Sequence, residues 1–260
     1  MGLLDKFNIN LTGMDGQIVS PARSAALEAL LFKKLGDIDL VSVERLRSKK
    51  NVVLRLNYGS SFQEHYESIV AKLFITDFYE TELRRLQISK EGGLRVPEVI
   101  AARGGVIVMT FVPGVPFVTR INESFDPVLV DQLASWYYEY HSINSMIKGD
   151  ATLRNFICTS DGLYGLDFEE SRKGHWMSDI GGTAASLLDT DPINDIRKRK
   201  LVWRLLDRYL THLSESRNEA TDRLYLKTIV DSLRETYRWR LDERILRLSE
   251  QIRTKGIPVR

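Results

Sequence analysis

Three oxygen-bearing side chains stand close together in the middle of this chain. Asp150 follows Gly149, Asn155 comes five residues later, and Asp167 follows a short apolar stretch. Phosphoryl transfer from a magnesium–nucleotide complex requires one carboxylate that orients and deprotonates an attacking hydroxyl, and further oxygen ligands that hold the metal. These residue types supply that set. The pattern therefore predicts a phosphotransferase site of the kinase-like type.

A β-hairpin is expected between Asn155 and Asp167. The intervening residues 156–166 are mostly apolar and contain Asp161-Gly162, a strong signal for a hairpin turn. Such a hairpin returns the chain to its starting loop and places Asp167 beside Asn155. An amide and a carboxylate could then hold a magnesium ion together with nucleotide phosphates and water. The alternative is that these residues only cap helices and form turns, but their joint spacing favours a function.

The same residues carry a resemblance to a known family. Gly149-Asp150, Asn155 and Asp167-Phe168-Glu169 resemble the catalytic and metal-binding motifs of the aminoglycoside phosphotransferase/choline kinase group. The small atypical kinase of the tRNA threonylcarbamoylation complex is also similar. The resemblance extends from about Val41 to beyond Leu188. It implies ATP and Mg²⁺ as cofactors.

The resemblance also implies roles for single residues. Asp150 matches the catalytic base, and Asn155 and Asp167 match the metal ligands. Asp179 resembles the aspartate that buttresses the catalytic loop; it could also cap the helix that starts near Ile180, and the two roles are compatible.

Lys72 matches the strand lysine that pairs with nucleotide phosphates and with a helix glutamate. Its partner is Glu80 or Glu82 on the following helix. Only one of these can point inward, since they differ by two positions. Glu80 is preferred because Leu83 and Leu86 follow it on the inward side.

A glycine-free turn stands where the family has a glycine-rich loop over the phosphates. Residues other than glycine cannot let the backbone approach phosphate as closely. The side chains of this turn either contact the phosphates or only form an exposed basic turn. The sequence favours neither alternative. The candidate nucleotide-binding residues here are Ser48, Lys49, Lys50 and Asn51.

A segment of four residues and two single residues also bear on the site. Met109, Thr110, Phe111 and Val112 resemble the hinge whose backbone binds adenine. Lys148 stands where the family has a histidine, and a charged lysine cannot accept a hydrogen bond. Arg154 is a catalytic candidate that could neutralise the transferred phosphoryl group; a surface ion pair is an equal alternative.

The surrounding pattern predicts an α+β protein with a two-lobed, protein-kinase-like fold. Residues 1–111 are expected to form a small antiparallel-sheet lobe that binds the nucleotide and contains one key helix. Residues 112–260 are expected to form a larger, mostly helical lobe for catalysis and acceptor binding. A Pro/Gly linker at 112–116 separates them. The expected elements are strands near 40–43, 52–56, 68–74, 96–100 and 106–111, and helices near 22–35, 77–89 and 128–141.

Composition limits the kind of protein, its partners and its location that we expect. With 260 residues, 43% of them hydrophobic, the chain can bury a substantial core. A net charge of +2 gives little reason to expect nucleic acid as the main partner. A lone Cys158, no visible secretory signal and no apolar run of about 20 residues favour a cytoplasmic protein without a membrane partner. The four histidines are dispersed, so no zinc site is expected.

Three functions are compatible with these patterns. The first is a kinase that transfers the γ-phosphoryl group of Mg-ATP to a hydroxyl of a small molecule. The second keeps the chemistry but acts on Ser or Thr of a protein, or as an ATPase within a complex. The third is a nucleotide-binding module without catalysis, motivated by Lys148 and the glycine-free turn. The acceptor and the oligomeric state are not encoded in a readable motif.

Overall fold

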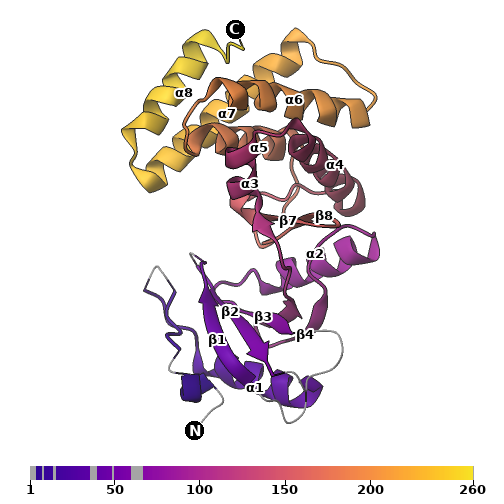
Figure 1. Ribbon diagram of the computed structural model, residues 1–260, viewed down its shortest axis with the longest axis vertical. Coiled ribbons are helices and arrows are strands. Elements are labelled where there is room, and N and C mark those ends of the chain that lie inside the picture. The colour runs from indigo at the N-terminus through magenta and orange to yellow at the C-terminus, as the bar shows by residue number, and fades with distance from the viewer. Residues whose placement is uncertain are drawn as a thin grey trace. The chain divides into compact units, whose positions relative to one another are not determined.

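The computed structural model describes residues 4–7, 9–13, 16–35, 40–48, 50–59 and 67–259 (Figure 1). The chain divides into two compact units. The first consists of residues 1–90 and 97–112, and the second of residues 91–96 and 113–260.

The first unit is built on a five-stranded antiparallel sheet, which confirms the expected sheet lobe. Its strand order is β1-β2-β3-β5-β4. Side chains of β2 alternate between buried and half-buried, the period-two pattern of a strand with one face on the core. The strands are β1 (Leu40–Leu46), β2 (Val52–Tyr58), β3 (Ser68–Leu73), β4 (Val99–Arg103) and β5 (Val106–Thr110).

Two helices accompany this sheet. α1 (Pro21–Leu35) begins with proline at its first position, where no backbone donor is needed. Leu27 and Leu31 of α1 are fully buried in one cluster with Leu54 and other sheet residues. α2 (Tyr79–Glu91) lies between β3 and β4 in the chain. The first unit therefore has its core between α1 and the sheet. A 3-10 helix, η1 (Leu4–Phe7), precedes α1.

The second unit is mostly helical, as expected. It also contains a small sheet in which β7 lies between β6 and β8. The helices are α3 (Phe117–Ser124), α4 (Pro127–Asn144), α5 (Met177–Asp189), α6 (Ile196–His212), α7 (Glu219–Arg240) and α8 (Glu243–Lys255), with the 3-10 helix η2 (Leu153–Asn155); the strands are β6 (Val115–Pro116), β7 (Phe156–Thr159) and β8 (Gly162–Gly165).

Polar side chains define where several of these helices begin. Asp126, Asp195, Asn218 and Asp242 each accept a hydrogen bond from a backbone N–H in the first turn of α4, α6, α7 and α8, respectively. Each satisfies a donor that the helix itself cannot pair, which is the usual reason for Asp and Asn at this position.

α5 is the central helix of the second unit. Nearly all its residues are buried, and it packs against α7, α6 and α4. Gly181 allows the closest approach, because a Cβ there would lie 2.5 Å from Cγ2 of Thr228 on α7. A helix enclosed on several sides is a rigid support for the loops that precede it.

The boundary between the units differs slightly from the expected division at residues 111 and 112. Residues 91–96 belong to the second unit. The carbonyl oxygen of Arg95 accepts hydrogen bonds from the backbone of Gly165 and from Nε1 of Trp136, both at 3.1 Å. These bonds anchor the segment after α2 to β8 and α4. The linker also contains a short strand, since Val115 pairs with Cys158.

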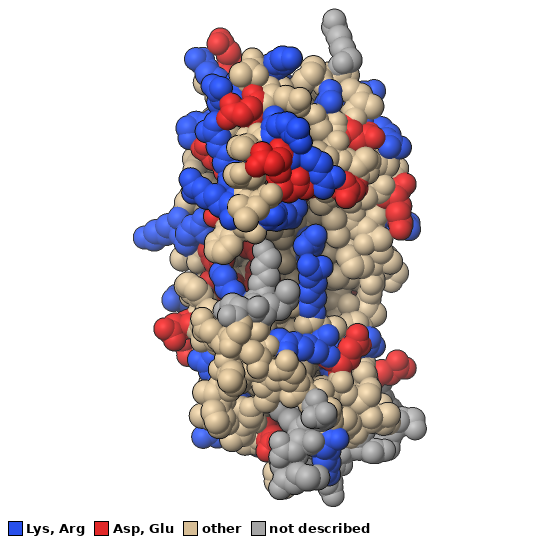
Figure 2. Space-filling model, turned by 90° about the vertical axis from the view of Figure 1, so that its left-hand side faces the viewer, with Lys and Arg blue, Asp and Glu red and all other residues tan. Residues whose placement is uncertain are grey.

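Charged side chains of both signs are interspersed on the face of the second unit shown in the upper part of Figure 2. Arg234 and Arg253 both pair with Glu250, at 2.6 and 2.8 Å, and Arg244 pairs with Asp242 at 2.7 Å. Charges of both signs therefore alternate along a solvated face of α7 and α8. Within the described residues, no helix is both long enough and apolar enough to cross a membrane.

Candidate active site

The loop between α4 and η2 carries Asp150. Nδ2 of Asn155 donates to Oδ2 of Asp150 at 3.0 Å and to its carbonyl oxygen at 3.3 Å. Gly149 makes the preceding turn possible: its φ is +92°, and a Cβ there would lie 2.3 Å from the carbonyl oxygen of Glu170. A side chain at this position would clash. The structure therefore brings Asp150 and Asn155 together, as their spacing predicts.

The hairpin of β7 and β8 returns the chain to this loop. The backbone N–H of Leu166, directly after β8, donates to the carbonyl oxygen of Asn155 at 2.8 Å. The next residue is Asp167, whose φ of +59° lies in the left-handed region that Asp tolerates better than most residues. The structure thus joins the segments of all three candidate residues within the second unit.

Lys148 has a role that the sequence did not reveal. It is fully buried, and its Nζ donates to the carbonyl oxygens of Asp150 at 2.8 Å and Asp167 at 2.7 Å. The inability of lysine to accept a hydrogen bond is no defect here, because both partners are acceptors.

Asp179 is the centre of a buried hydrogen-bond network. Its Oδ1 accepts from the backbone N–H of Gly149 at 2.9 Å, and its Oδ2 accepts from the backbone N–H of Lys148 at 2.5 Å. Asp179 lies in the first turn of α5 and is not its N-cap residue, which is Trp176. Its side chain therefore holds the loop that carries Asp150, and the expected additional role as the cap of α5 is not fulfilled.

His141 on α4 completes this network. Its Nε2 lies 2.9 Å from Oδ2 of Asp179, and its Nδ1 lies 2.7 Å from the hydroxyl of Tyr209 on α6. Because a carboxylate only accepts, Nε2 is the nitrogen that carries the hydrogen in this arrangement. Burial raises the pKa of the Tyr209 hydroxyl, and the charge of Asp179 raises it further. The sequence offered no signal for this role, since His141 and Asp179 are 38 residues apart.

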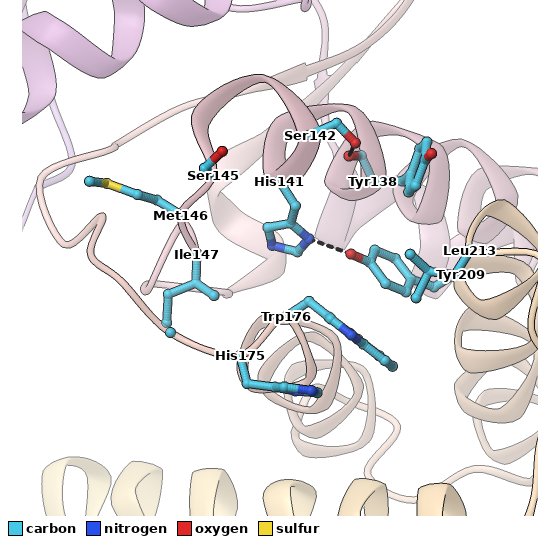
Figure 3. A pocket seen from close by; sticks show the side chains of 11 residues that line it. Tyr138, His141, Ser142, Ser145, Met146, Ile147, His175, Trp176, Tyr209 and Leu213 are labelled. Carbon is cyan, nitrogen blue, oxygen red and sulfur yellow. Dashed lines mark hydrogen bonds between the residues drawn. The ribbon is translucent and has the colours of Figure 1, made fainter.

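A cavity of about 300 Å³ lies beside this network (Figure 3). His141 points toward Tyr209, and the ring of Trp176 stacks on that of Tyr209 with 4.6 Å between centroids. Ile147, which precedes the catalytic loop, lines the opposite side (Figure 3). His141 and Tyr209, which belong to the network that supports the loop, therefore also line the cavity.

Aromatic side chains of α4 pack in the interior of the second unit. Trp136 and Tyr140 stack on each other at 5.4 Å, and Trp136 contacts Phe156 of β7 edge-on at 5.0 Å. Tyr140 also stacks on Phe168 at 5.6 Å. These contacts join α4 to both ends of the hairpin and position the residues that follow it.

In the first unit, Lys72 of β3 pairs with Glu82 of α2, at 2.5 Å between Nζ and Oε2. Both side chains are buried, whereas Glu80 is exposed. The preference for Glu80 is therefore wrong. The rotation of α2 about its axis decides the partner, and Glu82 shares the buried face with Leu86.

The turn between β1 and β2 contains the expected phosphate-contacting residues. Ser48 and Lys50 are half-buried, and Lys49 lies outside the described residues. Asn51 is only 1% exposed, and its Oδ1 accepts from the backbone N–H of Ile75 at 3.0 Å. A phosphate contact by this atom would have to replace a bond that anchors the start of β2.

The expected adenine-binding segment lies at the end of β5. Met109 is buried. The backbone N–H of Thr110 donates to the carbonyl oxygen of Glu98 at 2.9 Å, and the backbone N–H of Glu98 donates to Oγ1 of Thr110 at 3.0 Å. The ring of Phe111 lies under the guanidinium of Arg55, 3.9 Å from its centroid. Val112 is the last residue of the first unit.

Arg154 is exposed at the middle of η2. Its charge acts on Asp189, the last residue of α5, which the sequence did not single out. Burial raises the pKa of Asp189 to about 6, while Arg240, Arg154 and Lys198 lower it. Nη1 of Arg240 lies 3.2 Å from Oδ2 of Asp189. Arg154 therefore stands at the edge of a cluster that is rich in cations.

Comparison with known proteins gives a family and a fold. Residues 39–176 match the family model of the RIO domain. No curated protein sequence matches the chain.

Solved structures of kinases resemble the whole arrangement. The amicoumacin kinase hAmiN in complex with AMP-PNP, Ca²⁺ and Ami has a TM-score of 0.59 at 12% identity, over 90% of this chain and 93% of that chain. The ADP-bound aminoglycoside phosphotransferase APH(2'')-Ib has a TM-score of 0.56 at 15% identity, over 85% and 90%. Choline kinase from Cryptosporidium parvum Iowa II has a TM-score of 0.53 at 12% identity, over 81% and 87%.

At these identities the solved structures show the fold alone, which is the expected protein-kinase-like one. The RIO model, in contrast, matches the sequence over more than half of the chain, from β1 through the loop of Asp150 to the residue before α5. This chain belongs to the RIO domain family.

Proposed function

We propose that this protein is a phosphotransferase that moves the γ-phosphoryl group of Mg-ATP to a hydroxyl group, with a small molecule as the acceptor. The observation that carries the proposal is the bond between Nδ2 of Asn155 and Oδ2 of Asp150 on a loop clamped by Asp179. A fixed carboxylate beside an amide is suited to orient a hydroxyl and to take its proton in the transition state.

The donor atoms around Asp150 suit a magnesium ion. Because Nδ2 of Asn155 donates to Asp150, the Oδ1 of Asn155 is the atom that can face a cation. Asp167 adds a carboxylate, and Glu169 stands two residues further on. Hard oxygen donors of this kind suit Mg²⁺, which would neutralise the charge that develops on the phosphates. In this proposal Asp150 holds the acceptor hydroxyl, and Asn155 and Asp167 hold the metal.

Residues of the first unit would bind the nucleotide. Lys72 is held in place by Glu82 and would present its ammonium to the phosphates. Ser48, Lys49 and Lys50 of the turn after β1 would add polar contacts, with Asn51 supporting the turn. The backbone of residues 109–112 would accept adenine. Arg154 would neutralise the transferred group.

The small-molecule acceptor is supported by the solved kinases of similar fold, whose names refer to amicoumacin, aminoglycosides and choline. A second candidate is phosphorylation of a protein, or ATP hydrolysis within a complex, which the RIO domain match favours. A module that binds nucleotide without catalysis is the remaining alternative. The donor set around Asp150 argues for catalysis.

The test of the reaction is Asp150→Asn, which keeps the size of the side chain and removes its charge. Magnesium-dependent transfer from labelled ATP should fall by at least about a hundredfold, the usual contribution of a general base, while nucleotide affinity stays unchanged. Asp161→Asn, in the exposed hairpin turn, is the matched control and should transfer at the wild-type rate. Undiminished turnover in Asp150→Asn would remove the residue from this role.

The acceptor is tested separately. Wild-type protein and labelled ATP are incubated with pooled hydroxylated metabolites, with protein fractions, and with water alone. Labelled metabolite supports the small-molecule kinase, whereas labelled protein or phosphate release alone supports the second candidate. Nucleotide binding without any labelled product would leave only the non-catalytic module.

A further inference from the structure

The ammonium of Lys148 donates hydrogen bonds to two segments that are separated in the sequence. Its bond to the carbonyl oxygen of Asp150 is 2.8 Å long, and its bond to that of Asp167 is 2.7 Å long. The β7–β8 hairpin lies between these residues in sequence. In addition to the backbone bond between Leu166 and Asn155, one side chain therefore bridges the backbones that carry the candidate base and a candidate metal ligand.

The backbone of Asp167 has a conformation that needs support. Its φ is +59°. Left-handed backbone is unfavourable at a residue other than glycine, and it persists where surrounding contacts determine it. The bond from Lys148 to the carbonyl oxygen of Asp167 is such a contact.

The burial of the Lys148 ammonium has a cost that its polar partners offset. Lys148 is 0% exposed, and removing an ammonium from water costs several kcal/mol unless polar partners replace the water. Two carbonyl oxygens do so, and the rings of Phe168 and Phe156 lie with their centroids 5.5 and 5.9 Å from Nζ, within range of a cation–π interaction. A neutral side chain of similar length would fill the same volume without this cost.

We propose that Lys148 is a positioning residue of the phosphotransfer site: its ammonium fixes the backbones of Asp150 and Asp167 relative to each other, so that both carboxylates serve the same metal–nucleotide complex. This inference rests on the function proposed above. Lys148 does not touch the reacting atoms and acts only through these two residues.

A second buried lysine provides a matched control. Lys198 of α6 is also 0% exposed, and its Nζ donates to the carbonyl oxygen and to Oγ1 of Thr190, at 2.6 and 2.9 Å. Its bonds therefore end on one residue, outside both the 148–155 and the 167–169 segments. Losing either lysine should destabilise the second unit, but only the loss of Lys148 should disturb the metal ligands.

The experiment compares Lys148→Met with Lys198→Met in the full chain. Methionine keeps the length of the side chain and removes the charge and the donors. Mn²⁺ binding in the presence of AMP-PNP is measured by electron paramagnetic resonance, together with thermal unfolding and phosphoryl transfer. Lys148→Met should raise the Mn²⁺ concentration for half-saturation by about tenfold or more, the usual effect of losing a residue that orients metal ligands, and should lower kcat by a similar factor. Lys198→Met should lower the melting temperature but keep Mn²⁺ affinity within about twofold of wild type.

The outcomes separate this inference from the proposed function. Wild-type Mn²⁺ affinity in folded Lys148→Met, or equal losses in both variants, would overturn the positioning role. If Lys148→Met does not fold, Lys148→Gln, which keeps one amide donor, should show an intermediate loss of affinity, and unchanged affinity would overturn the inference. Wild-type protein that binds Mn²⁺ and AMP-PNP without transferring phosphate contradicts the proposed reaction but leaves the Lys148 comparison decisive. Absence of Mn²⁺ binding in wild type overturns both.

Discussion

Nε2 of His141 lies 2.9 Å from Oδ2 of Asp179, a carboxylate that is 0% exposed and that also accepts the backbone N–H groups of Lys148 and Gly149. One buried side chain thus connects α4, α5 and the candidate catalytic loop. The loop is held by its backbone, which leaves the side chain of Asp150 out of this support and available for its proposed role. Such a support is needed where chemistry depends on a narrow geometry.

Asp179→Asn should therefore impair both stability and turnover. The introduced amide can turn only one oxygen toward the loop, so at least one buried N–H loses its acceptor. We expect a loss of about 2–4 kcal/mol in the free energy of unfolding and a fall of more than about tenfold in turnover. Urea unfolding and a transfer assay measure the two effects. Asp207→Asn on the exposed part of α6 is the control, and equal behaviour of the two variants would contradict the role of Asp179.

Glu82→Gln and Glu80→Gln form a matched pair on α2. Only Glu82 is buried with Lys72, so its neutralisation removes a buried negative charge that pairs with the ammonium. The expected loss in the free energy of unfolding is about 2–4 kcal/mol for Glu82→Gln and less than about 0.5 kcal/mol for Glu80→Gln. Denaturant titration distinguishes the two, and a larger loss at Glu80 would mean that the assignment of the partner is wrong.

Gly149→Ala and Gly93→Ala separate backbone strain from steric clash. Both glycines have positive φ, +92° and +84°, but a Cβ at Gly93 meets no atom within 4 Å. Gly93→Ala should cost about 1 kcal/mol from conformation alone. Gly149→Ala should cost clearly more, because its Cβ would lie 2.3 Å from the carbonyl oxygen of Glu170. Equal losses of stability would argue against the tight turn before Asp150.

Asp189 predicts a pH dependence of stability. Its pKa rises from 3.8 to about 6 on folding, chiefly through burial, so the folded state binds more protons than the unfolded state between these values. The stability contributed by Asp189 therefore decreases as pH rises from about 4 to about 6. Its buried Oδ1 has no hydrogen-bond partner among the described residues, which is consistent with a carboxylate that is costly to ionise.

The measurement is the difference in unfolding free energy between wild type and Asp189→Asn. The free energy of unfolding of the variant should increase relative to that of wild type as pH rises, by up to about 3 kcal/mol between pH 4 and pH 7. Burial lowers the pKa of Lys198 to about 8, which lies above this range, so the change between pH 4 and pH 7 is assigned to Asp189. A constant difference across this range would contradict the raised pKa.

The sequence was sufficient for features that depend on short separations. The alternation of residues 52–56, the Asp161-Gly162 turn and the spacing of Asp150 and Asn155 are local, and local dihedral preferences and side-chain periodicity determine what they form. The five strands, the hairpin and α4 lie close to where these patterns predict them. Helix α3 and the two-residue strand β6 were not predicted. Strand β6 is defined by its pairing with distant residues such as Cys158, and a local pattern does not show such a pairing.

Tertiary structure determined which way side chains point and which distant residues they contact. Glu80 and Glu82 differ in the sequence only by position, and the rotation of α2 on the sheet selected Glu82. The partnership of His141 with Asp179 joins residues on different helices. Lys148 in the sequence is a departure from a histidine motif, and in the fold it bridges two loops. Contacts between distant residues arise only when the chain packs, so no local pattern contains them.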